Sequence, residues 1–276
     1  MTASPLPESE TDVLIIGAGP TGLMSATWMT RLGVKTRIID KRNTKIFTGH
    51  ADGLQCRSLE IFDSFGFADR VWKEANHMLE VRMWNPDKNG RIQRSEIIPD
   101  TPPGVSRFTE VVLHQGRIEH FFLDHMKKYG DIQVERGVMP ESLSIDESKV
   151  EDPNAHPVTV QLRHLTQDER VPAQKAIDWG PAETIQDELF QSNLTDDDTD
   201  ELLRRSREKK SMSEIVHAKY VIGCDGAHSW TRRQIGAELE GELTDFIWGV
   251  LDIVPITNFR KSFSMILVTF TLIDIS

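Results

Sequence analysis

The stretch TDVLIIGAGPTGLMSATWMTRLGVKTRIIDKR, residues 11 to 42, decides the fold class of this chain. Residues 13 to 16 form a short apolar run typical of a buried strand, and three glycines follow it at the spacing G-x-G-x-x-G. Residues 21 to 32 have the pattern of a helix that Gly33 ends, and residues 34 to 40 have the pattern of a second strand. A strand, a glycine turn, a helix and another strand predict an α/β fold that begins with a Rossmann-like unit.

Each glycine of this turn has its own physical role. Gly17 permits a tight turn, Gly19 lets a pyrophosphate approach the backbone, and Gly22 lets the helix and the strand pack closely. Asp40 ends the second strand, where its carboxylate can accept hydrogen bonds from a ribose hydroxyl. The pattern favours a dinucleotide site over a tight turn without a ligand, and it does not choose between NAD(P) and FAD. The predicted contacts along the turn are Gly17, Ala18, Gly19, Pro20, Thr21 and Gly22.

The composition limits the partners of this chain. Its net charge of -11 argues against nucleic acid or an anionic membrane surface as a partner, because both attract positively charged proteins. Cys56 and Cys224 are the only cysteines, too few for a disulfide framework, which fits a reducing, cytoplasmic setting. Residues 1 to 10 are expected to form a flexible tail rather than a signal peptide. The apolar residues 263 to 276 fall short of the roughly 20 that a membrane helix needs, so no membrane span is predicted.

A second motif lies in KYVIGCDGAHSWTRRQIG, residues 219 to 236. Its pattern D-G-x-x-S-x-x-R, formed by Asp225, Gly226, Ser229 and Arg232, resembles the second fingerprint of the single-component flavoprotein aromatic hydroxylases. In that family the first motif binds the ADP part of FAD, and the second lies near the flavin pyrophosphate and the path of NADPH. The alternative is an ordinary turn from strand to helix with an aspartate that caps the helix.

Two further segments resemble the same family. TGHADGLQCRSLEIFDSFG, residues 48 to 66, is similar to the stretch after the second strand in phenol 2-monooxygenases and their hydroxybenzoate-hydroxylating relatives. VVLHQGRIEHFFLDHM, residues 111 to 126, is similar to the segment whose glutamine touches the flavin side, here Gln115. The four motifs cover residues 12 to about 259, and a Rossmann dehydrogenase is not expected to carry the last three.

The resemblance implies a reaction and its participants. Such an enzyme passes hydride from NADPH to FAD and transfers one oxygen of O₂, through a flavin hydroperoxide, to a phenolic ring. The implied reaction is ortho-hydroxylation of phenol or a hydroxybenzoate-like compound, with a small aromatic substrate and O₂. The full-length form is expected to be a homodimer. Asp52 matches the substrate-side carboxylate and is the candidate base, with a turn aspartate beside Gly53 as the alternative. The resemblance adds Asp40, Lys41, Arg42, Gln55, Arg57, Gln115, Asp225 and Gly226 as cofactor-binding residues.

No metal is predicted, because His50 and His228 have no partner at metal-ligand spacing. The expected organisation is a Rossmann-like FAD-binding domain of the hydroxylase type, residues 11 to 259, interleaved with part of a β-rich substrate domain. Within it, residues 133 to 165 are expected to form a β-meander laid on the Rossmann part.

Residues 167 to 214 are expected to form an acid-rich, mobile surface insertion, with a short helix over residues 197 to 210. Residues 260 to 276 resemble nothing that follows in the family, so a C-terminally truncated chain is expected. A non-catalytic fragment of the flavin fold is therefore an alternative to an active enzyme, and a dehydrogenase that binds NAD through the first motif alone is a more distant one.

Overall fold

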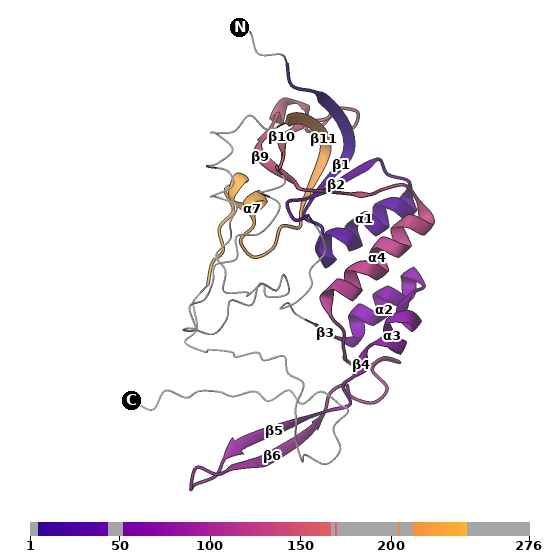
Figure 1. Cartoon of the computed structure of the whole chain (residues 1–276), viewed down its shortest axis with the longest axis vertical. Coiled ribbons are helices and arrows are strands. Elements are labelled where there is room, and N and C mark those ends of the chain that lie inside the picture. Colours follow the sequence, from indigo (N-terminus) through magenta and orange to yellow (C-terminus); the bar gives the residue numbers. More distant parts are fainter. Residues whose placement is uncertain (1–4, 44–51, 167–168, 170–203, 205–211, 242–276) are drawn as a thin grey trace. The chain divides into compact units, whose positions relative to one another are not determined.

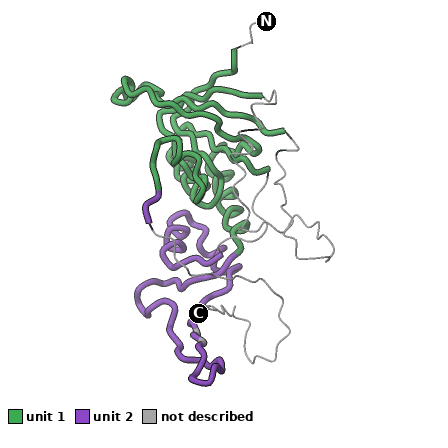
Figure 2. The backbone as a smooth tube through the Cα atoms, turned by 90° about the vertical axis from the view of Figure 1, so that its left-hand side faces the viewer, with its two compact units in different colours: residues 1–50, 114–238 green, residues 51–113, 239–276 purple. Residues whose placement is uncertain are grey.

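A computed structural model describes most of the chain, which divides into two compact units (Figures 1 and 2). The first unit runs through residues 1–50 and 114–238, and the second through residues 51–113 and 239–276. Each unit is described by itself. The described residues are 5–43, 52–166, 169, 204 and 212–241.

The first unit contains a six-stranded sheet in the order β8-β2-β1-β11-β10-β9. Its parallel half consists of β8 (Val134–Arg136), β2 (Thr36–Asp40), β1 (Glu8–Ile16) and β11 (Ser213–Gly223). Leu14 and Ile15 near the carboxyl end of β1 are both fully buried, as expected for a central strand that is covered on both faces. The predicted strand, helix and second strand of the opening stretch are confirmed.

Strand β1 begins earlier than the sequence predicted. Glu8, Ser9 and Glu10 pair in parallel with Ile215, Val216 and His217 of β11. Residues 8 to 10 therefore belong to the sheet rather than to a flexible tail, because β11 is long enough to satisfy their backbone groups.

The antiparallel half of the sheet corrects the expected β-meander. β9 (Val138–Ile145) pairs with β10 (Val158–His164), which pairs with β11, so these strands extend the Rossmann sheet instead of lying on it. β8 also comes from the expected meander, but it pairs in parallel with β2 at the opposite edge. Gly137 separates β8 from β9 with φ of 70°, a left-handed conformation that breaks the apparently continuous strand pattern.

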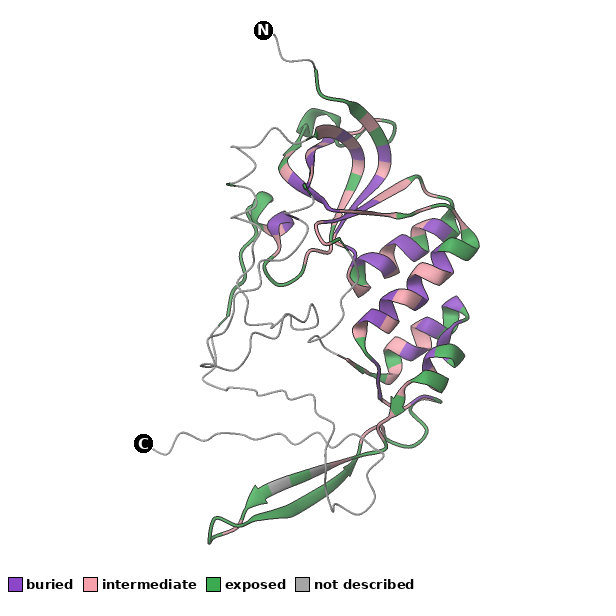
Figure 3. Cartoon of the chain, in the orientation of Figure 1, coloured by how far each residue is buried: buried purple, intermediate pink, exposed green. Residues whose placement is uncertain are grey.

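Helix α1 (Pro20–Leu32) follows the glycine turn and ends at Gly33, whose φ is 67°. The end at Gly33 confirms the predicted stop. Helix α4 (Gln115–Tyr129) packs on α1, and both helices turn a buried stripe inward (Figure 3). The other helices among the described residues of this unit are a 3₁₀ turn, η1 (Glu147–Lys149), and the short α7 (Trp230–Gln234).

The described part of the second unit contains small sheets and two helices. Helix α2 (Cys56–Phe65) is the amphipathic helix predicted to begin near Arg57, and α3 (Ala68–Glu74) follows it. A three-stranded sheet and a two-stranded hairpin complete the described part. Their strands are β3 (Gly53–Leu54), β7 (Val111–Val112) and β4 (Asn76–His77), and β5 (Glu80–Pro86) with β6 (Ile92–Pro99).

Several sequence expectations fall partly or wholly outside the described residues. The helix over 197–210 and the tail over 260–276 lie there, apart from Arg204. Ser213 and Glu214 belong to β11, so the described part of the chain places the end of the insertion before residue 213. Among the described helices, none has the length and apolar character that a bilayer-spanning segment requires.

Candidate functional site

The chain's own backbone requires two of the three glycines in the turn. Gly17 has φ of 101°, and a Cβ built on it would lie 2.3 Å from the carbonyl oxygen of Cys224. A Cβ on Gly22 would lie 1.9 Å from the carbonyl oxygen of Gly17. These two positions exclude every side chain, as the predicted roles of tight turn and close packing demand.

Gly19 is different, because nothing in the described chain requires a glycine there. Its φ is -73°, which any residue adopts, and a Cβ on it would meet no atom within 4 Å. Gly19 is also the N-cap of α1, with no side-chain cap and no acid in the first turn, so neither of these offsets the positive end of the helix dipole. A helix amino end of this kind is suited to an anionic group.

Asp40 links the end of β2 to this turn. Its Oδ2 accepts a hydrogen bond of 2.7 Å from the backbone N–H of Ala18, and its Oδ1 accepts a hydrogen bond of 2.7 Å from the backbone N–H of Arg42. The side chain is nearly buried. Because each carboxylate oxygen has two lone pairs, both oxygens can still accept a ligand hydroxyl. The structure thus brings the predicted turn residues, Asp40 and Arg42 together at one edge of the sheet.

The second motif meets the first at the end of β11. The backbone N–H of Cys224 donates to the carbonyl oxygen of Ile16 at 2.7 Å, beside Gly17. Burial raises the pKa of the Cys224 thiol. Gly226, with φ of 84°, has a conformation that favours glycine.

The polar side chains of the second motif bind one another. The carboxylate of Asp225 accepts hydrogen bonds from Ser229 Oγ at 2.5 Å and from the backbone N–H of Thr231 at 2.8 Å. Arg232 donates to the carbonyl oxygen of Ala227 at 2.8 Å. The Asp225 carboxylate therefore braces the turn that opens α7, but the N-cap of α7 is Ser229, whose Oγ accepts from the backbone N–H of Arg232 at 3.0 Å, so Asp225 is not the capping residue that the alternative described.

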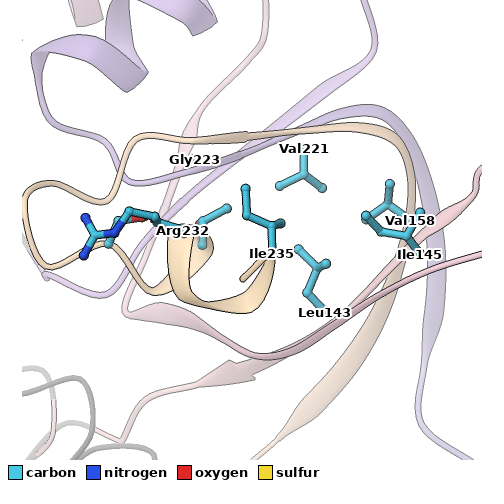
Figure 4. Close-up of a pocket in the computed structure, with 9 residues that line it drawn as sticks. Leu143, Ile145, Val158, Val221, Gly223, Arg232 and Ile235 are labelled. Atoms are coloured by element: carbon cyan, nitrogen blue, oxygen red, sulfur yellow. The ribbon is translucent and has the colours of Figure 1, made fainter. Parts of the chain in front are cut away.

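An apolar hollow of about 330 Å³ lies between α7 and the antiparallel half of the sheet (Figure 4). Ile235 lies opposite side chains from β9, β10 and β11, and Arg232 lies at one end. No sequence pattern predicted this hollow, because its lining comes from strands far apart in the chain. The lining residues are Leu143, Ile145, Val158, Val221, Gly223, Ser229, Thr231, Arg232 and Ile235.

Gln115 is the first residue of α4, and His114 caps the helix by accepting from the backbone N–H of Gly116 at 3.1 Å. The Gln115 amide donates through Nε2 to Oε1 of Glu119 at 3.1 Å. Glu119 is only 1% exposed and was not singled out from the sequence. The sequence feature that could have identified Glu119 is its position four residues after Gln115, on a helix face that is otherwise apolar.

Lys41 follows Asp40 directly after β2 in the first unit, and the remaining predicted site residues lie in the second unit. Asp52 is partly buried, its carbonyl oxygen accepts from the backbone N–H of Leu113 at 2.8 Å, and its carboxylate has no partner among the described residues. Arg57 has a side chain 80% exposed and pairs with Glu60 of its own helix at 2.5 Å. Among the described residues, the Asp52 carboxylate thus caps no turn or helix.

Gln55, like Gln115, forms a hydrogen bond with a glutamate. Its Nε2 donates to Oε2 of Glu110 at 2.6 Å. Burial raises the pKa of Glu110, and the neighbouring Asp100 carboxyl raises it further. The sequence gives no hint of this acid pair, because a loop separates its two members.

Comparison with known proteins decides the family. The family model described as the FAD binding domain matches residues 10–156 and 155–272. The chain belongs to this FAD-binding domain family. The match extends past residue 259, after which the non-family tail was expected to begin.

The FAD-binding domain is shared with curated monooxygenases. The chain is 33% identical over 255 residues to phenol 2-monooxygenase fsqG of Aspergillus fumigatus, with 91% of this chain and 34% of that protein covered. It is 33% identical over 257 residues to 3-hydroxybenzoate 4-monooxygenase of Comamonas testosteroni, covering 91% of this chain and 33% of that protein. The resemblance to flavoprotein aromatic hydroxylases is therefore confirmed, and the chain spans about a third of the length of these relatives.

A solved structure shares the fold of this FAD-binding domain. The flavin-dependent monooxygenase PieE, solved in complex with FAD and substrate, aligns with a TM-score of 0.58 and 22% identity over 86% of this chain and 34% of PieE. The predicted fold class, a Rossmann-like FAD-binding domain of the hydroxylase type, is confirmed.

Proposed function

We propose that this chain holds FAD at the edge of the sheet where β1, β2 and β11 end. The observation that carries this proposal is the open space at Gly19, a glycine that the described part of the chain does not itself need. The FAD pyrophosphate would lie there, against the amino end of α1. The ribose would bind the remaining lone pairs of Asp40, and the turn that contains Gly226 would border the pyrophosphate. Gln115 would contact the flavin side.

We further propose that the complete protein is an NADPH-dependent monooxygenase that hydroxylates a phenolic ring next to its hydroxyl group. The names of two relatives support the position: phenol 2-monooxygenase and 3-hydroxybenzoate 4-monooxygenase both denote a carbon beside the existing hydroxyl. Bound FAD would accept hydride from NADPH and activate O₂. The residues of the chain would bind, orient and shield the reacting groups.

Asp52 is the proposed base for the phenol. A ring attacks an electrophilic oxygen better as its hydroxyl loses its proton, because the ortho carbon gains electron density. A carboxylate that accepts the phenolic hydrogen bond, and then the proton, therefore accelerates the oxygen transfer. The match of Asp52 to the substrate-side carboxylate of the family that the chain resembles supports this role over that of a turn aspartate.

The absorption spectrum of the purified chain tests the binding proposal. A bound-flavin spectrum that survives gel filtration is expected. A colourless protein that takes up no added FAD would favour a fragment that does not hold the cofactor. Binding of NADH without any flavin would favour a dehydrogenase-type site that uses only the first motif.

A further inference from the structure

Glu119 is a carboxylate on an apolar helix face. It is 1% exposed and lies on the side of α4 that buries Ile118, Phe122 and Met126. An acidic group in such surroundings lowers stability unless hydrogen bonds satisfy it. One of those bonds comes from Gln115, one helical turn earlier, whose Nε2 lies 3.1 Å from Oε1 of Glu119.

This bond decides which end of the Gln115 amide faces outward. The bond runs from Nε2 of Gln115 to Oε1 of Glu119, so the NH₂ end of the amide faces Glu119 and the carbonyl oxygen faces away. Gln115 is partly exposed at the first residue of α4. In the part of the chain that the structure describes, no group donates to its carbonyl oxygen.

We propose that Glu119 is a positioning residue that makes Gln115 a hydrogen-bond acceptor toward the flavin. The proposal rests on the proposed function, in which Gln115 contacts FAD. The edge of a flavin ring carries both an N–H donor and carbonyl acceptors, so a glutamine free to flip could satisfy either. With its amide nitrogen held by Glu119, Gln115 presents its oxygen and selects a donor of the flavin moiety.

A double-mutant cycle tests this role. Glu119→Met replaces the carboxylate by an apolar, unbranched side chain that suits a helix, and Gln115→Ala removes the amide. Each single variant is expected to bind FAD about tenfold more weakly and to shift the flavin absorption bands. Because Glu119 acts through Gln115, the double variant should bind FAD no more weakly than Gln115→Ala alone. Glu119→Gln keeps an acceptor oxygen and should recover most of the affinity.

A purely structural role predicts a different pattern. Glu119→Met would then lower FAD affinity by the same factor with or without Gln115, together with the melting temperature of the apoprotein. That additive result, or an unchanged affinity and spectrum in Glu119→Met, would overturn the proposal.

An NMR measurement separates this proposal from the proposed function. The side-chain amide signals of Gln115 are identified in the apoprotein as those lost in Gln115→Ala, and they should move in Glu119→Met. If the parent chain takes up no FAD, the proposed function fails. The NMR signals still decide the orienting role, because unmoved signals contradict it.

Discussion

At the scale of single residues, Asp40 does more than the sequence assigned to it. Its two oxygens accept from the backbone of Ala18, inside the glycine turn, and of Arg42, just after β2. The same carboxylate that would bind ribose thus fixes the loop that would bind the pyrophosphate. The spacing of Asp40 from the glycines predicted a ligand contact. The hydrogen bond to Ala18 could not be predicted, because it depends on how the turn folds back on β2.

We expect Asp40→Asn to weaken both folding and FAD binding. Asparagine has one acceptor oxygen, so its NH₂ group would face one of the two backbone donors and leave it unsatisfied. The free energy of unfolding of the apoprotein should fall by about 1 to 3 kcal/mol, and the FAD dissociation constant should rise roughly ten- to a hundredfold. Urea unfolding and a fluorescence titration measure these two quantities.

Asp12→Asn is the matched control, because Asp12 also lies on a strand of the parallel sheet but pairs with Lys219 at 2.8 Å, outside the turn. If Asp40→Asn and Asp12→Asn give the same unfolding energy and the same dissociation constant, the dual role of Asp40 is wrong.

Asp52→Asn separates a base from a turn residue. Asparagine keeps the shape but cannot take the phenol proton, so NADPH oxidation should continue while hydroxylation slows by about 10² to 10⁴, with O₂ leaving as H₂O₂. A turn role predicts near-normal rates, since asparagine suits turns almost as well as aspartate. The assay compares NADPH consumed with product formed, in a chain of the relatives' full length. Undiminished coupling in the variant would remove Asp52 from the mechanism.

At the scale of elements, the acid-rich stretch leaves and re-enters the sheet at neighbouring positions. Arg163 of β10 pairs in register with Ser213 of β11, and the backbone N–H of His164 donates to the carbonyl oxygen of Met212 at 2.9 Å. The buried Arg163 of β10 also pairs with Glu169 at 3.0 Å.

Because the two ends of the insertion are held next to each other by β10 and β11, we expect most of the insertion to be dispensable for the fold. Replacing residues 172 to 209 by a short Gly-Ser linker should leave the far-UV circular dichroism of the sheet intact and change the melting temperature by only a few degrees, about what 1 kcal/mol produces. A control deletion that also removes Glu169 should be less stable, because it strips the buried Arg163 of a partner. An unfolded product from the shorter deletion would contradict the account.

Glu214 at the start of β11 makes the sheet sensitive to acid. Hydrogen bonds from Arg37, opposed by burial and aided by His164, hold its pKa below the ordinary value. A lowered pKa stabilises the fold above the unfolded-state value of about 4.3, and this contribution is lost as the pH falls through the folded-state value.

We expect Glu214→Gln to lower the free energy of unfolding at pH 7 and to flatten its decline below pH about 4. Glu147→Gln, on the exposed η1 turn, serves as the control. Urea unfolding across pH 3 to 7 measures both profiles. Parallel profiles for the parent and Glu214→Gln would show that this carboxylate does not carry the acid sensitivity.

At the scale of the whole molecule, local pattern predicted the parts of the site that are local. The glycine turn, helix α1 with its end at Gly33, and β2 follow from residues adjacent in the chain. The sheet edge that β8 occupies depends on its contact with the distant strand β2. The pairing of Asp100 with Glu110 depends on the path of the loop between them. Gly137 marked the break between β8 and β9, but the apolar pattern around it concealed the change of direction.

The most direct test of the central claim is an FAD titration of Gly19→Val beside the parent chain. The open space at Gly19 lets the variant fold, so its melting temperature should stay within a few degrees of the parent. The valine side chain would occupy the space proposed for the pyrophosphate, so FAD binding should fall below detection. Gly22→Ala is the control, expected to unfold instead because its Cβ meets the carbonyl oxygen of Gly17. Full FAD occupancy in folded Gly19→Val would contradict the claim that this edge of the sheet holds the cofactor.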